Sequence, residues 1–129
     1  MTQYIGKPFK DHGRGPDGYD CIGLVLQIYK DNGIEVPDIW KYDKSTGRKA
    51  MKNFLLSVAA AETAETGWVK TEKEPLAMVV FKVGGILHAG VMLDDEKFIH
   101  ALEGTSVCVE SLNNPIWANR VKGFYKWST

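Results

Sequence analysis

Apolar residues in the first half of the chain recur at the spacing of an α-helix. One stripe predicts a helix from about Cys21 to Asn32, capped by Asp20 and ended by Gly33. A second stripe predicts a helix from about Arg48 to Glu65. The loop before the first helix, residues 6–18, is rich in glycine and proline. The apolar positions of the two stripes are Leu24, Val25, Ile28 and Tyr29, then Met51, Phe54, Leu55 and Val58.

The second half of the chain consists of short apolar runs separated by glycine or polar turns. Such runs predict strands, and their succession along the chain predicts an antiparallel sheet. Helices first and strands afterwards indicate an α+β fold in which the helices pack on a five-stranded antiparallel sheet. The length fits a single domain over residues 1–129. The predicted strands are Met78–Val83, Leu87–Leu93, Phe98–Ala101, Val107–Val109 and Val121–Trp127.

Composition narrows the classes of function. The 16 Lys and Arg residues balance 16 Asp and Glu residues, so no basic excess favours nucleic-acid binding. No apolar stretch approaches the length of a membrane span, and the N-terminus lacks the apolar core of a secretory signal. If the protein acts outside the cell, it must therefore be exported by a route that needs no such signal, or its sequence has been trimmed. Two cysteines are too few for a disulfide framework, and a reduced pair is expected.

Cys21 is the first candidate for chemistry. It directly follows Asp20, at the start of the predicted helix, where the helix dipole favours a thiolate and predicts a lowered pKa. The competing interpretation is a small, buried apolar residue. Gly23, in the first turn, leaves room for the close approach of another backbone or of a substrate, or is a packing glycine.

His88 and His100 lie on two predicted strands whose pairing decides whether they meet. Side chains alternate between the two surfaces of a sheet, so a four-residue loop at 94–97 would place the two imidazoles on opposite surfaces. A three-residue loop places His100 opposite Gly90 or Met92, on the surface that His88 shares. A catalytic pair therefore requires an odd loop or a bulge, and Gly90 would leave room for an imidazole over the strand.

Together these residues predict a Cys-His-His hydrolase. His88 would accept the proton of Cys21 and later donate it to a leaving amine, and His100 would orient His88. Backbone N–H groups at the helix start would stabilise the oxyanion. This chemistry requires no cofactor and no metal. A zinc site formed by the same three residues is an alternative, although the short-range ligand spacing typical of zinc is missing.

Three blocks of the chain resemble the NlpC-type cell-wall cysteine peptidases, a compact branch of the papain-like fold. The resemblance spans nearly the whole chain, with the blocks in the family's order. It implies Cys21 as nucleophile, His88 as base and His100 as the residue that orients it. The blocks are Asp20-Cys21-Ile22-Gly23-Leu24-Val25, His88-Ala89-Gly90-Val91-Met92-Leu93 and Phe98-Ile99-His100-Ala101.

The ends of the chain, at 5–9 and 121–125, look like the phage-tail branch of that family. The resemblance implies cleavage of the bond between D-glutamate and the diamino acid of a peptidoglycan stem peptide. It also implies a place in the virion tail, or in the host cytoplasm before assembly, with other tail-tip proteins as partners. Asp20, Phe9 and Gly90 are the candidate substrate-binding residues, Phe9 standing where many relatives have a tyrosine.

Two other functions fit the same residues. One is a non-catalytic tail component that retains a hydrolase fold, and the other is a papain-like amidase or acyltransferase. The remaining candidates are expected to be structural: His12 as a solvated loop residue and Cys108 as an inert core thiol. Most of the large aromatic residues are expected in the core or at interfaces, although they could line a groove; they are Trp40, Tyr42, Trp68, Trp117 and Trp127.

Overall fold

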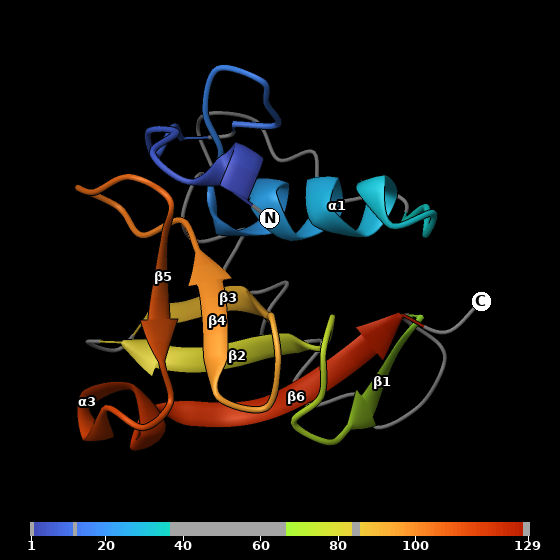
Figure 1. Cartoon of the computed structure of the whole chain (residues 1–129), viewed down its shortest axis with the longest axis vertical. Helices are drawn as coiled ribbons and strands as arrows, with labels where there is room; N and C mark the ends of the chain where they lie inside the picture. Colours follow the sequence, from blue (N-terminus) through green and yellow to red (C-terminus); the bar gives the residue numbers. More distant parts are fainter. Residues whose placement is uncertain (1, 12, 37–66, 84–85, 128–129) are drawn as a thin grey trace.

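A computed structural model describes residues 2–11, 13–36, 67–83 and 86–127. In these residues a helix lies over an antiparallel sheet, and a second, short helix lies at the far side of that sheet (Figure 1). In chain order the elements are η1 (Thr2–Tyr4), α1 (Cys21–Asp31), β1 (Trp68–Thr71), β2 (Met78–Val83), β3 (Ile86–Met92), β4 (Lys97–His100), β5 (Cys108–Ser111), α3 (Pro115–Ala118) and β6 (Val121–Trp127).

Helix α1 forms where the apolar stripe predicts it. The carboxylate of Asp20 accepts the N–H of Gly23 at 2.6 Å, which satisfies a donor that the first turn leaves unpaired. Gly33 follows the helix with a φ of 80°, the left-handed conformation typical of a helix end. The four predicted apolar positions are buried. The second predicted helix, at 48–65, lies outside the described residues, as do His12 and the pair Trp40 and Tyr42.

The sheet has six strands in the described residues, so the predicted number of five is wrong. The order is β1-β6-β2-β3-β4-β5, and every neighbouring pair is antiparallel. The additional strand is β1, which pairs with the C-terminal half of β6 from Trp68 opposite Trp127 to Thr71 opposite Phe124. Four residues of mixed polarity carry too little periodicity to predict a strand, and only the pairing with β6 defines it.

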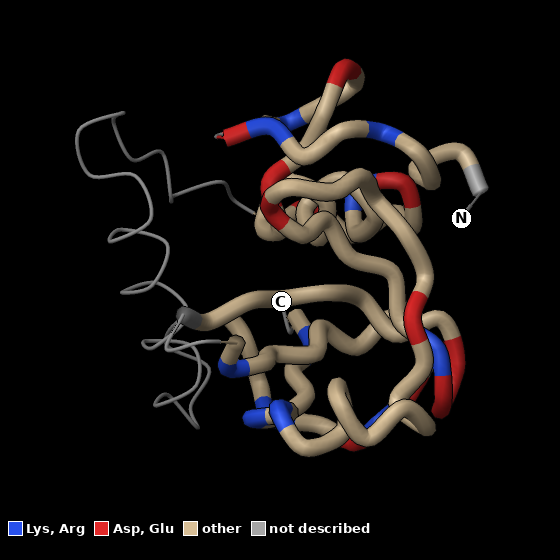
Figure 2. Tube along the Cα trace, turned by 90° about the vertical axis from the view of Figure 1, so that its left-hand side faces the viewer, with Lys and Arg blue, Asp and Glu red and all other residues tan. Residues whose placement is uncertain are grey.

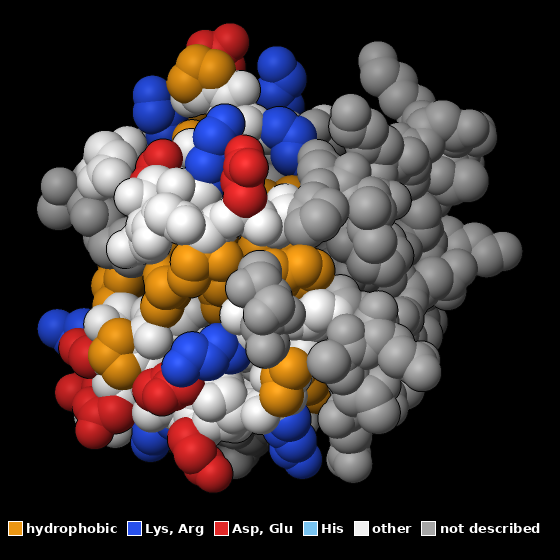
Figure 3. Space-filling view, turned by 90° about the vertical axis from the view of Figure 1, so that its right-hand side faces the viewer, with side chains coloured by type: hydrophobic (Ala, Val, Ile, Leu, Met, Phe, Trp, Pro, Cys, Tyr) orange, Lys and Arg blue, Asp and Glu red, His pale blue; other side chains and the backbone are white. Residues whose placement is uncertain are grey.

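The two surfaces of the sheet bury different cores. The surface facing α1 carries Leu87, Ala89 and Val91 of β3, packed against the apolar stripe of the helix. The opposite surface carries Val79, Phe81, Met92 and Phe98, which pack against Trp117 of α3. Figure 3 shows apolar side chains gathered in a band across one side of the molecule, between charged side chains above and below. This division matters because neighbouring residues of β3 face different surroundings.

The hairpin between β3 and β4 has the odd loop that a histidine pair requires. Gly90 lies opposite His100, and the last backbone bond before the turn runs from the N–H of Leu93 to the carbonyl of Lys97. Three residues, 94–96, therefore form the turn. The carboxylate of Asp94 closes it by accepting the N–H groups of Glu96 and Lys97, each at 2.7 Å. The predicted sharing of one surface by the two histidines is confirmed.

Basic and acidic residues are interleaved over both layers of the described chain (Figure 2). Among the helices that the structure describes, none combines the length and the apolar character of a membrane span.

Gly23→Ala is expected to lower the free energy of unfolding by about 1–3 kcal/mol, the usual cost of an overpacked site. An added Cβ would lie 1.9 Å from the carbonyl oxygen of Gly13, a backbone atom that cannot rotate away. This clash outweighs the gain of about 1 kcal/mol from alanine's helix propensity. Urea unfolding would measure the difference, with Gln27→Ala on the same helix as control. A Gly23→Ala protein as stable as the control would contradict the clash.

Candidate active site

The start of α1 is held by a buried network around Asp20. Cys21, the first helical residue, is 3% exposed, and Asp20 is fully buried. Besides capping the helix, the Asp20 carboxylate lies 2.8 Å from the Arg14 guanidinium in an ion pair. The carbonyl of Gly13 accepts the N–H of Asp20 and packs against Gly23. Asp20 thus fixes the position of Cys21, and its contact with a substrate stays a prediction.

The two histidines form a hydrogen-bonded pair. Nε2 of His88 lies 2.8 Å from Nδ1 of His100, and the two residues are 6% and 1% exposed. Gly90 makes this approach possible, because a Cβ there would lie 3.1 Å from the His100 Cβ and 2.8 Å from the carbonyl oxygen of Ile99. Gly90 therefore leaves room for an imidazole, as the sequence predicts, and its role as a substrate contact stays a prediction.

Aromatic rings enclose the histidine pair on the surface of the sheet away from α1. Phe81 stacks on His88 with ring centroids 6.2 Å apart, and Phe98 lies 5.0 Å from His100. Trp117 of α3 meets His100 edge to face at 4.9 Å. This enclosure keeps water from most of both rings and fixes their orientation.

The backbone of β3 has a buried edge beside the histidine pair that the pairing with β4 does not reach. The N–H of Met92 donates to the carbonyl of Ala77 on the β2 side. Because successive N–H groups of a strand point to alternate edges, the N–H of Ala89 points to the β4 side. The pairing of β3 with β4 ends at Gly90 opposite His100, so Ala89 lies just beyond it.

The thiol of Cys21 lies at this edge of β3, where the backbone of Ala89 hydrogen-bonds to it. Ala89 directly follows His88, so the candidate nucleophile and the candidate base meet at adjacent residues of β3. The Ala89 side chain faces α1, whereas the His88 ring belongs to the opposite surface. The thiol therefore stands where the two surfaces meet, and a direct contact between Cys21 Sγ and the His88 ring stays a prediction.

The expected lowering of the Cys21 pKa is wrong for this structure. Burial raises the pKa of the thiol to about 12, and the negative charge of Asp20 adds to this rise. Backbone hydrogen bonds from Ala89 and Ile22, and the charge of Arg14, act in the opposite direction without overcoming burial. The helix dipole alone cannot decide the charge state of a thiol that water does not reach.

Both histidines are neutral at physiological pH. Burial lowers the pKa of His88 to about 3, with a further contribution from His100, and lowers the pKa of His100 to about 4. The charge of Glu110 partly offsets the second shift. These protonation states do not form a thiolate–imidazolium ion pair, so a nucleophilic thiolate would require transfer of the thiol proton to a base.

Cys108 does not lie in the core, contrary to the sequence prediction, and its expected inertness stays a prediction. It lies on β5 directly opposite His100, and its Sγ is 3.6 Å from His100 Nε2. Its side chain is partly exposed. The neighbouring residues Val107 and Val109 predict an apolar setting for Cys108. The register of β4 against β5, which no local pattern encodes, places the thiol beside the His100 imidazole.

Phe9 is half-buried against the core under α1. Its N–H donates to the carbonyl of Thr105, and it forms an isolated bridge with Tyr19. These contacts tie the loop before α1 to the segment after β4. Substrate contact by Phe9 stays a prediction.

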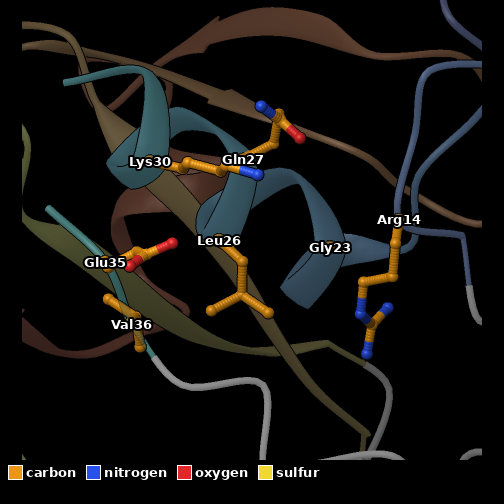
Figure 4. Close-up of a pocket in the computed structure, with 7 residues that line it drawn as sticks. All are labelled: Arg14, Gly23, Leu26, Gln27, Lys30, Glu35 and Val36. Carbon is orange, nitrogen blue, oxygen red and sulfur yellow. The ribbon is translucent and has the colours of Figure 1, made fainter. Parts of the chain in front are cut away.

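A polar pocket lies beside α1 (Figure 4). None of the three candidate catalytic residues lines it. Within the described part of the chain, no three His, Cys, Asp or Glu side chains are arranged to hold a metal ion. The pocket is lined by Arg14, Gly23, Leu26, Gln27, Lys30, Glu35 and Val36.

A helix-borne cysteine packed at the edge of an antiparallel sheet, with two hydrogen-bonded histidines on that sheet, defines a compact papain-like fold. The chain belongs to the NlpC/P60 family, whose family model matches residues 6–126. Two solved structures show the same fold. An NLP/P60-family lipoprotein-like protein of Staphylococcus aureus has a TM-score of 0.64 at 16% identity, covering 98% of this chain and 38% of that one. The NlpC/p60 domain of the peptidoglycan hydrolase SagA has a TM-score of 0.52 at 23% identity, covering 87% and 83%.

Curated relatives carry peptidase names. A protein of Escherichia coli K12 named murein DD-endopeptidase MepS/murein LD-carboxypeptidase is 25% identical over 93% of this chain and 57% of its own length. The probable endopeptidase NlpC of the same strain is 27% identical over 91% and 67%. The gamma-DL-glutamyl hydrolase of Bacillus subtilis is 24% identical over 97% of this chain and 27% of its own length. The chain thus spans little more than half of the MepS relative.

The free energy of unfolding is expected to fall as the pH falls from about 6.5 toward 4. Unfolded histidines take up protons near pH 6.5, whereas His88 and His100 in the folded protein resist protonation down to about pH 3 and 4. Their contribution is therefore complete above 6.5 and shrinks below it, by up to about 1.4 kcal/mol per pH unit for each histidine. Urea unfolding across this range would measure it, with His88→Gln as comparison. Parallel pH profiles for the two proteins would contradict the burial argument.

Cys21 is expected to react slowly with iodoacetamide at neutral pH in the folded protein, and more slowly than the partly exposed Cys108. A raised pKa and burial both lower the supply of accessible thiolate. Mass spectrometry of the labelled peptides over time would give both rates, with the unfolded protein as reference. Faster labelling of Cys21 than of Cys108 near pH 7 would show instead that its thiolate is stabilised.

Proposed function

We propose that this protein is a cysteine peptidase that hydrolyses the stem peptides of peptidoglycan. The observation that carries the proposal is the His88–His100 hydrogen bond of 2.8 Å, beside the strand residue whose backbone binds the Cys21 thiol. The names of the MepS and NlpC relatives support a cell-wall substrate. No step of this chemistry needs a metal or a cofactor.

The proposed reaction uses the free nitrogen of His88. Since Nε2 is engaged by His100, Nδ1 is the atom that accepts the Cys21 proton while Sγ attacks the carbonyl carbon. The N–H groups at the start of α1 stabilise the oxyanion. His88 then gives the proton to the departing amine nitrogen, and the C–N bond breaks to leave a thioester. Water, deprotonated by His88, releases the carboxylic acid and restores the thiol.

The bond that we propose is the one between D-glutamate and the following diamino acid. The resemblance of the sequence blocks implies this bond, and the name of the gamma-DL-glutamyl hydrolase relative supports it. The DD-endopeptidase name of the MepS relative points to a different bond, so product analysis has to separate the two.

The proposed place of action is the tail of a phage or prophage particle, with other tail-tip proteins as partners. The support is the resemblance of the segments 5–9 and 121–125 to the phage-tail branch of the family. Detection of this chain's peptides in purified particles tests this part of the proposal, and their absence would overturn it.

A non-catalytic tail component is the second candidate, because the two residues that must meet the substrate are almost fully buried. Cys21 is 3% exposed and His88 is 6% exposed. A catalytic protein has to admit a peptide to this edge of β3, whereas a structural component does not.

Cys21→Ala is expected to lower the rate of peptidoglycan cleavage by at least about 1,000-fold, as the loss of a nucleophile does. The protein should stay folded, because the substitution removes one buried atom. Mass spectrometry of fragments released from purified peptidoglycan would measure the rate. Fragments with a new C-terminal D-glutamate identify the proposed bond.

The matched control is Val25→Ala, which also removes buried atoms from α1 but no reacting group. It should retain turnover below its unfolding temperature. Wild-type protein that releases no fragments would favour the structural candidate, and cleavage by Cys21→Ala would exclude the cysteine mechanism.

A further inference from the structure

We propose that Cys108 is a positioning residue, which accepts a hydrogen bond from His100 Nε2–H and thereby keeps His88 in the tautomer that can take up the nucleophile's proton. The inference rests on the proposed peptidase function, because the direction of the hydrogen bonds is argued from the role of His88 as a base.

The geometry places Cys108 at the end of a chain of hydrogen bonds. His100 is 1% exposed and both of its ring nitrogens have a partner. Nδ1 lies 2.8 Å from His88 Nε2, and Nε2 lies 3.6 Å from Cys108 Sγ, which is within the longer reach of a sulfur atom. The pairing of β4 with β5 sets this contact, because His100 and Cys108 are directly opposite.

The direction of these bonds decides whether His88 can act as a base. A neutral imidazole carries one N–H. For Nδ1 of His88 to accept a proton, its hydrogen must be on Nε2, donated to Nδ1 of His100. His100 then carries its own hydrogen on Nε2, and a buried N–H needs an acceptor. Cys108 Sγ is the acceptor that the structure provides.

The reverse direction would block the proposed chemistry. If Cys108 donated its S–H to His100 Nε2, the hydrogen of His100 would move to Nδ1 and point at His88 Nε2. His88 would then carry its hydrogen on Nδ1, the nitrogen that has to accept the Cys21 proton. A thiol is both a weak donor and a weak acceptor, so the requirement that His88 act as a base is what selects the productive arrangement.

Glu110 adds an electrostatic reason for the productive state. It lies on β5 two residues after Cys108, and its carboxylate accepts the Nε1–H of Trp117 at 2.8 Å. Burial raises the pKa of Cys108 and the charge of Glu110 adds to this rise, whereas for His100 the same charge partly offsets the lowering of the pKa by burial. The carboxylate therefore favours a positive charge on the histidine pair during turnover and keeps Cys108 protonated, as a neutral acceptor.

The test compares Cys108→Ala, which removes the acceptor, with Cys108→Ser, which restores one. Nitrogen-15 NMR of the histidine rings reports the tautomers without any need for activity. We expect Nε2–H on both His88 and His100 in the wild-type and serine proteins, and a mixture with His88 Nδ1–H in the alanine protein. A wild-type His88 with its hydrogen on Nδ1, or an unchanged tautomer in Cys108→Ala, would overturn the proposal.

The kinetic arm uses peptidoglycan fragments as substrate. Cys108→Ala should lower kcat about three- to tenfold, the loss expected for one hydrogen bond, with KM unchanged, and Cys108→Ser should recover most of it. Val109→Ala on the same strand packs toward the α1 side and is the matched control. An equal loss of kcat in Val109→Ala would show a merely structural effect. A wild-type protein without activity would refute the peptidase function while the tautomers still decide the role of Cys108.

Discussion

The turn between β3 and β4 is the constraint on which the candidate site depends. Asp94 accepts two backbone N–H groups and closes a three-residue turn, which fixes Gly90 opposite His100. Side chains alternate along a strand, so a turn one residue longer would send the two imidazoles to opposite surfaces of the sheet. The hydrogen bond between His88 and His100 is therefore a consequence of the chemistry of a turn that begins six residues after His88 and ends four residues before His100.

Glycines at two contacts allow backbone elements to approach closely around this pair. Gly90 lets β4 bring the His100 imidazole over β3, and Gly23 lets the Gly13 carbonyl pack on the first turn of α1. The first contact positions the base pair and the second holds the loop that contributes Arg14 to the Asp20 carboxylate. The site is thus assembled from two parts, the capped helix start and the hairpin, which meet where the backbone of Ala89 hydrogen-bonds to the Cys21 thiol.

Burial sets the electrostatics of the site more strongly than the helix dipole does. A helix start favours a thiolate only where the charge can be solvated or paired, and Cys21 is 3% exposed beside a buried carboxylate. The same enclosure keeps both imidazoles neutral. Proton transfer from a neutral thiol to a neutral imidazole creates a thiolate–imidazolium pair, and in a water-poor environment this pair needs hydrogen bonds from the surrounding backbone.

The sequence by itself determined the first helix, the five strands that carry apolar runs, and the three residues of the candidate triad, because these depend on local periodicity and on short motifs. For a catalytic histidine pair, it also required an odd turn or a bulge between β3 and β4, because side chains alternate along each strand. Tertiary structure alone decided the rest. The strand β1 exists through its pairing with β6, and Cys108 meets His100 through the register of β5. The raised pKa of Cys21 follows from burial by segments far away in the chain, which no local pattern encodes.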